Sequence, residues 1–289
     1  NFKCFGYYGG MPKLNLKNPE VEKYITDVAC YWIKECDIDG WRLDVGDEIS
    51  HFFWKNFRKA VKAVKKDMLI IGEIWHYAGD FLEGDEWDTV MNYPFYLNLI
   101  DLLADEKITV SQFVQNLGYL KGRLHKNCYP LMWNLIDSHD TARFLHLCND
   151  NKKKQHLAAA FQLLLPGMPM IYYGDEYAMP GANDPDCRRG MYWDEEYQDK
   201  EMYEWYKRLI QVRKSHACIV EGELAGSVTE DEEGTVVLIR KNGEETIAMI
   251  FNCSSSAKKF NEYTQKYNLL TENTFDGNVE GFDAAVIVL

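Results

Sequence analysis

Three acidic residues stand where apolar, strand-like segments give way to loops. Asp44 follows GWRL, Glu73 follows MLIIG, and Asp140 closes the segment LIDSHD. Two carboxyl groups in different protonation states, one ionised and one carrying a proton, can together cleave a glycosidic bond. An acid at a strand end can also be a solvated side chain or a cap for the next helix. For any one of these residues taken alone, that structural explanation is preferred.

The immediate neighbours of two of these acids differ in chemistry. Side chains alternate along a strand, so Arg42 and Asp44 share one face. A cation beside a carboxylate favours its ionised form, whereas apolar neighbours such as Ile74 and Trp75 favour a protonated carboxyl group. Asp44 therefore suits a nucleophile and Glu73 a general acid. A purely structural ion pair between Arg42 and Asp44 remains an alternative.

Neither the histidines nor the cysteines form a metal-binding motif. His139, Asp140 and Glu73 would supply three ligands, but no second His stands at a spacing such as H-x-x-x-H. The eight Cys residues are scattered and include no C-x-x-C pair. We interpret them as buried free thiols, which fits a reducing compartment and therefore the cytoplasm. The chain starts at Asn1 without a signal-like segment, so this end leaves secretion open.

The elements that would position the acids alternate between strand and helix. Helices are predicted for NPEVEKYITDVACYWIKEC, with Asn18 as N-cap and Pro19 at the first position, for SHFFWKNFRKAVKAVKK, capped by Ser50, and for KKKQHLAAAFQLLL. Five strands are predicted, in DIDGWRLDV, MLIIGEIW, DTVMNY, YPLMWNLIDSHD and MPMIYYGDE. Apolar strands alternating with helices are typical of a parallel sheet covered on both faces. A (β/α)₈ barrel keeps its active site where such strands end.

We therefore predict an α/β fold in which residues 1–216 form a partial (β/α)₈ TIM barrel, with about the last five strands. Residues 217–289 contain short strands such as TVVLIRK and AAVIVL and no long helix, which predicts a separate antiparallel β-sandwich domain. The first three barrel strands are not found. We expect a fragment of a longer enzyme, half of a split enzyme, or a half-barrel that associates with itself to cover its open sheet edge.

The charge balance limits the partners of the chain. The formal net charge is -13, and no run of Lys or Arg is longer than Lys152–Lys154. Nucleic acids and anionic membranes both require a basic surface, so neither is a predicted partner. No apolar run approaches the length of a membrane span.

Several segments, in order, resemble a known family. GWRLDV, GEIW and SHD resemble three signature segments of the α-amylase superfamily of glycoside hydrolases. MPKLN, VMNYPF, YYGDE and NDPDCRRGMYWD resemble its neopullulanase, cyclomaltodextrinase and maltogenic amylase branch. The match covers roughly residues 5–215, and the β-domain fits the C-terminal sandwich of the family. The resemblance implies retaining hydrolysis of α-1,4-glucans, with maltooligosaccharides, cyclodextrins or pullulan as substrates.

The resemblance also assigns roles to individual residues. Asp44 is the expected nucleophile, Glu73 the acid and base, and Asp140 the acid that binds sugar hydroxyls and favours the distorted ring of the transition state. The expected substrate-binding residues are Arg42, which would orient Asp44, and His139, Trp75, Tyr93, Asp184, Arg188 and Glu48. Structural alternatives remain open: core packing for the two aromatic residues, a solvated loop for the Asp184–Arg188 stretch, and compensation of a helix dipole for Glu48.

One signature segment of the family is absent. It ends the third strand with an Asn-His pair that should precede MPKLN, and its Asn often helps to hold calcium. The resemblance implies no required cofactor; calcium is possible in a full-length enzyme, but its usual ligand segment is missing here. Because all three acids are present, an enzyme acting on α-glucan oligosaccharides is favoured. The alternative is an inactive fragment, or a non-catalytic carbohydrate-binding or interaction protein on an amylase scaffold.

Overall fold

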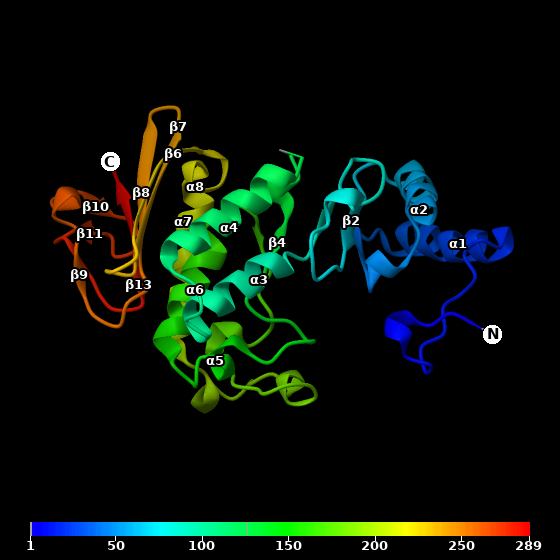
Figure 1. The fold of residues 1–289 in the computed structure, drawn as a ribbon, viewed down its shortest axis with the longest axis horizontal. Coiled ribbons are helices and arrows are strands. Elements are labelled where there is room, and N and C mark those ends of the chain that lie inside the picture. The colour runs from blue at the N-terminus through cyan, green and yellow to red at the C-terminus, as the bar shows by residue number, and fades with distance from the viewer. Residues whose placement is uncertain (1, 126) are drawn as a thin grey trace. The chain divides into compact units, whose positions relative to one another are not determined.

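The computed structural model describes residues 2–125 and 127–289, which divide into two compact units (Figure 1). The first unit comprises the chain up to Tyr93 together with Lys121–Trp133, and the second comprises Pro94–Leu120 and Asn134–Leu289. The domain boundary predicted between residues 216 and 217 falls inside the second unit. It stays a prediction about which part of the chain folds independently.

Two capped helices belong to the first unit. Helix α1 (Pro19–Cys36) begins after Asn18, whose side chain accepts a hydrogen bond from the Glu20 N–H group at 2.9 Å. Helix α2 (His51–Val64) begins after Ser50, whose hydroxyl accepts from the Phe53 N–H group at 3.4 Å. Both predicted helices and both predicted caps are therefore confirmed.

The sheet of the first unit is parallel, with the order β1 (Gly40–Leu43), β2 (Leu69–Gly72) and β3 (Thr89–Val90). Leu43 pairs with Gly72 at the carboxyl ends of the two longer strands. The residues that follow, Asp44 and Glu73, therefore leave the sheet at neighbouring positions. The prediction that these two acids stand at the ends of adjacent parallel strands is correct.

Most of the remaining helices lie in the second unit. The helices after β3 are α3 (Tyr93–Leu99), α4 (Val110–Arg123), α5 (Phe144–Leu147), α6 (Lys152–Leu164), α7 (Lys200–Ser215) and α8 (Ala217–Glu221). The strands β4 (Trp133–Asn134) and β5 (Met168–Pro169) pair with each other. All five predicted strand segments thus contain a strand, but β3, β4 and β5 have only two residues each. Closure of a barrel stays a prediction.

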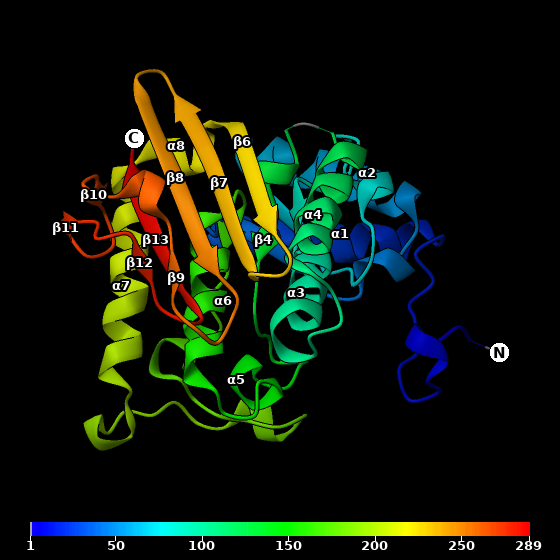
Figure 2. The same ribbon diagram turned by 60° about the vertical axis from the view of Figure 1, so that its left-hand side comes forward.

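The C-terminal segment forms an antiparallel sheet of six strands, which agrees with the predicted antiparallel β-domain, whereas its description as a separate sandwich stays a prediction (Figure 2). Its order is β11 (Asn273–Thr274), β10 (Tyr267–Asn268), β13 (Asp283–Val288), β8 (Glu245–Asn252), β7 (Thr235–Asn242) and β6 (Glu223–Glu230). A separate pair, β9 (Lys258–Lys259) and β12 (Asn278–Val279), completes the segment.

Side chains on the two faces of this sheet enter different cores. Met249 and Phe251 belong to the core that contains α6, whereas Ile250, between them, packs with Phe260 and Phe275 on the other face. The Phe251 ring stacks on Phe161 of α6, with ring centroids 4.2 Å apart. The sheet is therefore continuous in packing with the helices that precede it.

The cysteine prediction is correct only in part. All eight cysteines are free, but only Cys148, Cys187 and Cys218 are buried, and Cys36 is exposed.

Within residues 2–125 and 127–289, no helix combines the length and the apolar character that crossing a membrane requires.

Candidate active site

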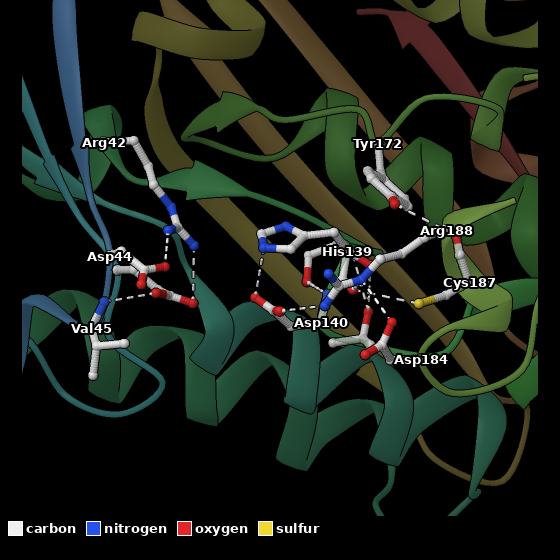
Figure 3. A network of polar contacts seen from close by, with 12 residues as sticks. Arg42, Asp44, Val45, His139, Asp140, Tyr172, Asp184, Cys187 and Arg188 are labelled. Atoms are coloured by element: carbon white, nitrogen blue, oxygen red, sulfur yellow. Dashed lines mark hydrogen bonds and ion pairs between the residues drawn. The ribbon is translucent and has the colours of Figure 1, made fainter. Parts of the chain in front are cut away.

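In the first unit, one guanidinium group contacts two of the predicted catalytic acids (Figure 3). Nη1 of Arg42 pairs with Oδ1 of Asp44, and its Nη2 lies 3.1 Å from Oε1 of Glu73. The two acids differ in exposure, because the Asp44 side chain is 68% exposed and that of Glu73 only 6%. The strand ends thus present one solvent-accessible carboxylate beside one enclosed carboxyl group.

The turn after Asp44 adds a contact that the sequence did not predict. Val45 has a φ of 46° and a ψ of 43°, a left-handed conformation that is rare for a β-branched residue. In this conformation its N–H group donates to Oε2 of Glu73 at 2.9 Å. Such strained residues cluster at functional sites, where the surrounding structure holds them in place. Valine gives no sequence signal for this geometry, because glycine and asparagine are the usual residues there.

The expected apolar environment of Glu73 is found only in part. Ile74 is buried, in agreement with the prediction. The Glu73 carboxyl group, however, accepts from the Val45 N–H group and lies 3.4 Å from the indole nitrogen of Trp75, besides its contact with Arg42. Polar donors therefore hold Glu73 in one orientation.

The two predicted aromatic site residues stack on each other. The rings of Trp75 and Tyr93 have centroids 4.0 Å apart and planes 13° from parallel. Tyr93 is 0% exposed, whereas Trp75 is 42% exposed. Tyr93 thus serves as the support under Trp75, and only Trp75 offers an open ring face. The prediction that an aromatic ring contacts a sugar therefore stays a prediction for Trp75, whereas the burial of Tyr93 argues against such a contact for its ring.

Glu48 contacts the MPKLN segment. Its Oε2 lies 2.6 Å from Nζ of Lys13, and its Oε1 accepts from the Gly6 N–H group at 2.8 Å. The hydrogen bond from Lys13 lowers the pKa of Glu48, and that from Gly6 adds to this effect. Glu48 ends a 3₁₀ turn, Gly46–Glu48, and stands just before the N-terminus of α2, so compensation of that helix dipole stays an alternative. A contact with substrate stays a prediction.

In the second unit, the structure brings together the other four predicted residues (Figure 3). Arg188 lies 2.8 Å from Asp184 through Nε and 3.4 Å from Asp140 through Nη2. The same Nε donates to the carbonyl oxygen of His139 at 2.8 Å, and the His139 ring lies 3.1 Å from Asp140. The NDPDCRR loop and the SHD loop thus share one polar cluster. The predicted site residues form two groups, one in each unit.

A buried arginine anchors that cluster, and sequence reasoning missed it. Arg143 is almost fully buried, and its Nη1 lies 2.9 Å from Asp175 and 2.6 Å from the carbonyl oxygen of Tyr173. Its Nε donates to the carbonyl oxygen of Cys187 at 3.2 Å, next to Arg188. Arg143 therefore ties the loops after β4 and β5 to the NDPDCRR loop. The available signal was a lone cation in the apolar stretch TARFLHL.

Two buried acids accompany Arg143. Burial and the adjacent Asp175 raise the pKa of Asp137 well above its usual range, and burial raises the pKa of Asp175 to about 6. Asp137 accepts from the Phe144 N–H group at 2.5 Å, and Asp175 accepts from Nη1 of Arg143 at 2.9 Å. The pair of carboxyl groups therefore retains protons to higher pH than an exposed aspartate does. Burial separates the role of Asp137 from that of Asp140, three residues later.

The described residues contain no group of three or more His, Cys, Asp or Glu side chains that could hold a metal ion. His139 and Asp140 instead contact each other and Arg188.

The chain matches the family model described as the catalytic domain of alpha amylase over residues 2–222. A cyclomaltodextrinase from Geobacillus thermopakistaniensis (strain MAS1) is 46% identical over 257 residues, which cover 89% of this chain and 44% of that enzyme. An intracellular maltogenic amylase from Bacillus subtilis (strain 168) is 43% identical over 253 residues, 87% of this chain and 43% of that protein. The chain thus spans less than half the length of these relatives.

A solved structure agrees with the sequence matches. A cyclomaltodextrinase superposes with a TM-score of 0.93 at 34% identity, covering 99% of this chain and 52% of the other. The resemblance of the GWRLDV, GEIW and SHD segments is therefore confirmed. A neopullulanase 2 from Thermoactinomyces vulgaris is 42% identical over 242 residues, 84% of this chain and 41% of that protein, so the relatives carry all three names of the predicted branch.

Proposed function

Because this chain belongs to the family of the alpha-amylase catalytic domain, we propose that it carries the catalytic acids of an α-glucan hydrolase. The proposed reaction cleaves α-glucosidic bonds with retention of configuration at the anomeric carbon. The observation that best supports it is the pair of contacts that Arg42 makes with Asp44 and Glu73. A retaining mechanism requires two carboxyl groups about 5–5.5 Å apart, and a shared guanidinium group is compatible with such a separation.

In the first step, Asp44 attacks the anomeric carbon while Glu73 donates its proton to the leaving glycosidic oxygen. This forms a β-glycosyl ester of Asp44 and releases one sugar product. In the second step, Glu73 removes a proton from water, which attacks the anomeric carbon and frees Asp44. The exposure of Asp44 suits a nucleophile that must reach a sugar, and the contacts of Glu73 suit an acid that must keep its orientation.

The other predicted residues have binding roles in this proposal. Asp140 and His139 bind sugar hydroxyls, and Asp140 favours the distorted ring of the transition state. Asp184 and Arg188 hold a sugar on the non-reducing side, supported by the ion pair between them. The other residues with binding roles are Arg42, which orients both acids, Trp75, whose open face packs on a sugar ring, and Glu48, on the leaving-group side.

The proposed substrates are α-1,4-glucans, namely maltooligosaccharides, cyclodextrins and pullulan. The proposed bond cleavage uses carboxyl groups and no metal ion, so we expect hydrolysis to continue in the presence of EDTA. A bound calcium ion is proposed only for a full-length enzyme. The proposed compartment of the protein is the cytoplasm, where free thiols such as that of Cys36 stay reduced.

We also propose that β1 is covered in the functional assembly. It lies at one edge of the described parallel sheet, and the neighbouring helix α1 exposes Tyr24, Tyr31 and Trp32. The proposed cover is a segment with further barrel strands, or a second copy of this chain. Light scattering on the purified protein distinguishes a monomer of 33.7 kDa from a dimer.

The stereochemistry of the product tests the proposed reaction. Proton NMR during hydrolysis of a maltooligosaccharide should show the α-anomer first, with the β-anomer arising later by mutarotation. The β-anomer as first product would mean inversion and would contradict a covalent role for Asp44. Absence of hydrolysis would favour the non-catalytic carbohydrate-binding alternative.

A further inference from the structure

A cavity lined by three tyrosines lies in the second unit, apart from the predicted site residues. Its volume is about 450 Å³, within the range of about 300–1,000 Å³ that is usual for small-molecule sites. Tyr177, Tyr192 and Tyr197 line it, and none of the residues assigned to the active site does. The proposed function therefore leaves this cavity without a role.

The cavity is held in place by its own segment of the chain. The side-chain amide of Gln198 donates to the carbonyl oxygen of Tyr192 at 2.8 Å, and the Tyr197 N–H group donates to the Asp194 carbonyl oxygen at 3.1 Å. Asp199 caps α7 through the Met202 N–H group at 2.9 Å. These bonds fix the backbone on both sides of Tyr197, so a ligand would meet a site that is already formed.

The aromatic rings present open surface. The centroids of Tyr192 and Tyr197 lie 5.8 Å apart with their planes at 50°, while Tyr177 is supported by a stacked Tyr203 at 5.3 Å. Tyr197 is 59% exposed, and the adjacent Trp193 is 82% exposed. So much exposed aromatic surface on one short segment is unusual unless it contacts a partner.

The polar lining selects the kind of ligand. The carboxylates of Asp150 and Glu196 offer hydrogen bonds, while the amide of Gln198 is engaged with Tyr192 and Lys200, and Nζ of Lys152 is paired with Asp199 at 2.6 Å. Anionic ligands are therefore disfavoured. A neutral polyhydroxylated ring suits this lining, because it offers an apolar C–H face to an aromatic ring and hydroxyls to the acceptors.

We propose that this tyrosine pocket is a second carbohydrate site, which binds an α-glucan oligosaccharide without cleaving it. The identity of the ligand rests on the proposed function of the chain. Binding here would hold a long glucan on the protein while another part of the same chain is cleaved. Trp193, beside the pocket, makes binding visible as a change in fluorescence.

The test measures maltoheptaose binding to the full chain in an Asp44→Asn background, which the proposed function expects not to cleave the ligand, by Trp fluorescence and by calorimetry. In the Tyr197→Ala variant we expect the Kd to rise at least about tenfold, as is usual for loss of an aromatic anchor. Tyr197→Phe keeps the ring and should bind like the wild type, as should Tyr267→Ala, which removes a half-exposed tyrosine from β10. Hydrolysis of a short chromogenic maltooligosaccharide should be unchanged in a Tyr197→Ala variant that keeps Asp44.

An unchanged Kd in Tyr197→Ala would overturn the proposal. Displacement of maltoheptaose by tetramethylammonium would overturn it too, because the tyrosines and carboxylates would then form a site for an organic cation. A failure of the proposed function has a different signature, namely hydrolysis that persists in Asp44→Asn. The two failures are therefore distinguishable.

Discussion

Nη2 of Arg42, on β1, lies 3.1 Å from Oε1 of Glu73, which directly follows β2. The same guanidinium group contacts Asp44, one residue beyond the end of β1. Its planar fork can hold two carboxyl groups at a fixed spacing, which a single ammonium group cannot do. The register of β1 and β2, with Leu43 opposite Gly72, brings all three side chains within reach. The pairing of β1 with β2 thus brings Asp44 and Glu73 close together, and Arg42 fixes the spacing between their carboxyl groups.

We predict that Arg42→Lys lowers kcat by about 10–100-fold, because loss of the fork lets the two acids shift by the order of 1 Å. The free energy of unfolding should change by less than about 1 kcal/mol, since the ion pair between Arg42 and Asp44 is partly exposed. Steady-state kinetics and urea unfolding measure the two effects. Arg58→Lys is the matched control, because Arg58 pairs with Asp88 in the same unit and should leave kcat unchanged.

Val45→Gly should leave the free energy of unfolding unchanged or raise it by up to about 1.5 kcal/mol. Glycine relieves a left-handed conformation that costs about 1–2 kcal/mol, and this gain exceeds the entropy cost of about 0.5–1 kcal/mol. Val228→Gly on β6 lacks that relief and should lose about 0.5–1 kcal/mol. Equal losses in both variants, measured by urea unfolding, would show that Val45 is unstrained.

The buried pair of Asp137 and Asp175 should make stability depend on pH. Both pKa values are raised, so the folded state binds more protons than the unfolded state between about pH 4, the usual value of an Asp, and about pH 6. The free energy of unfolding contributed by the pair therefore falls as the pH rises through this window.

Asp137→Asn should reduce that fall, because the amide can still donate to Asp175 and accept from the Phe144 N–H group without carrying charge. Urea unfolding at pH 4, 5, 6 and 7 should show a difference between variant and wild type that grows with pH in favour of the variant. The exposed Asp39→Asn serves as control and should keep the wild-type slope. Parallel curves for Asp137→Asn and the wild type would contradict raised pKa values in this pair.

Phe251→Ala should cost about 3–5 kcal/mol, because the ring is fully buried on Phe161 of α6. The loss should appear in one cooperative transition, since the sheet and α6 share a core. Leu224→Ala, on the exposed part of β6, should change stability by less than about 1 kcal/mol. Two separate transitions in calorimetry would instead support an independent domain from residue 217.

The sequence predicts the elements best where local signals are strong. Asn18 and Ser50 cap helices by their own side chains, and the charged ends of GWRLDV and GEIW mark real strand ends. Asp140 is less directly placed, because β4 ends at Asn134 and five residues lie between the two. Tertiary contacts, which no local pattern encodes, hold that longer loop.

The contacts that were missed share a physical cause. Val45 and Arg143 act through a backbone conformation and through buried hydrogen bonds to carbonyl groups, and neither depends on residue spacing. Tyr93 was expected to face a sugar, yet its burial under Trp75 depends on how α3 begins. The sequence thus predicts which residues are candidates for the site, whereas the direction in which each side chain points depends on the fold.

The most direct test of the account is hydrolysis of a chromogenic maltooligosaccharide by the purified protein and by two Asp→Asn variants. Asp44→Asn should lose activity by at least about 10³–10⁴-fold, as is usual for removal of a nucleophile. Asp39→Asn, just before the other end of β1, should retain it, because that acid pairs only with Lys65 in the described residues. Turnover that persists in Asp44→Asn, or is absent from the wild-type protein, would contradict the proposal that Asp44 is a catalytic nucleophile.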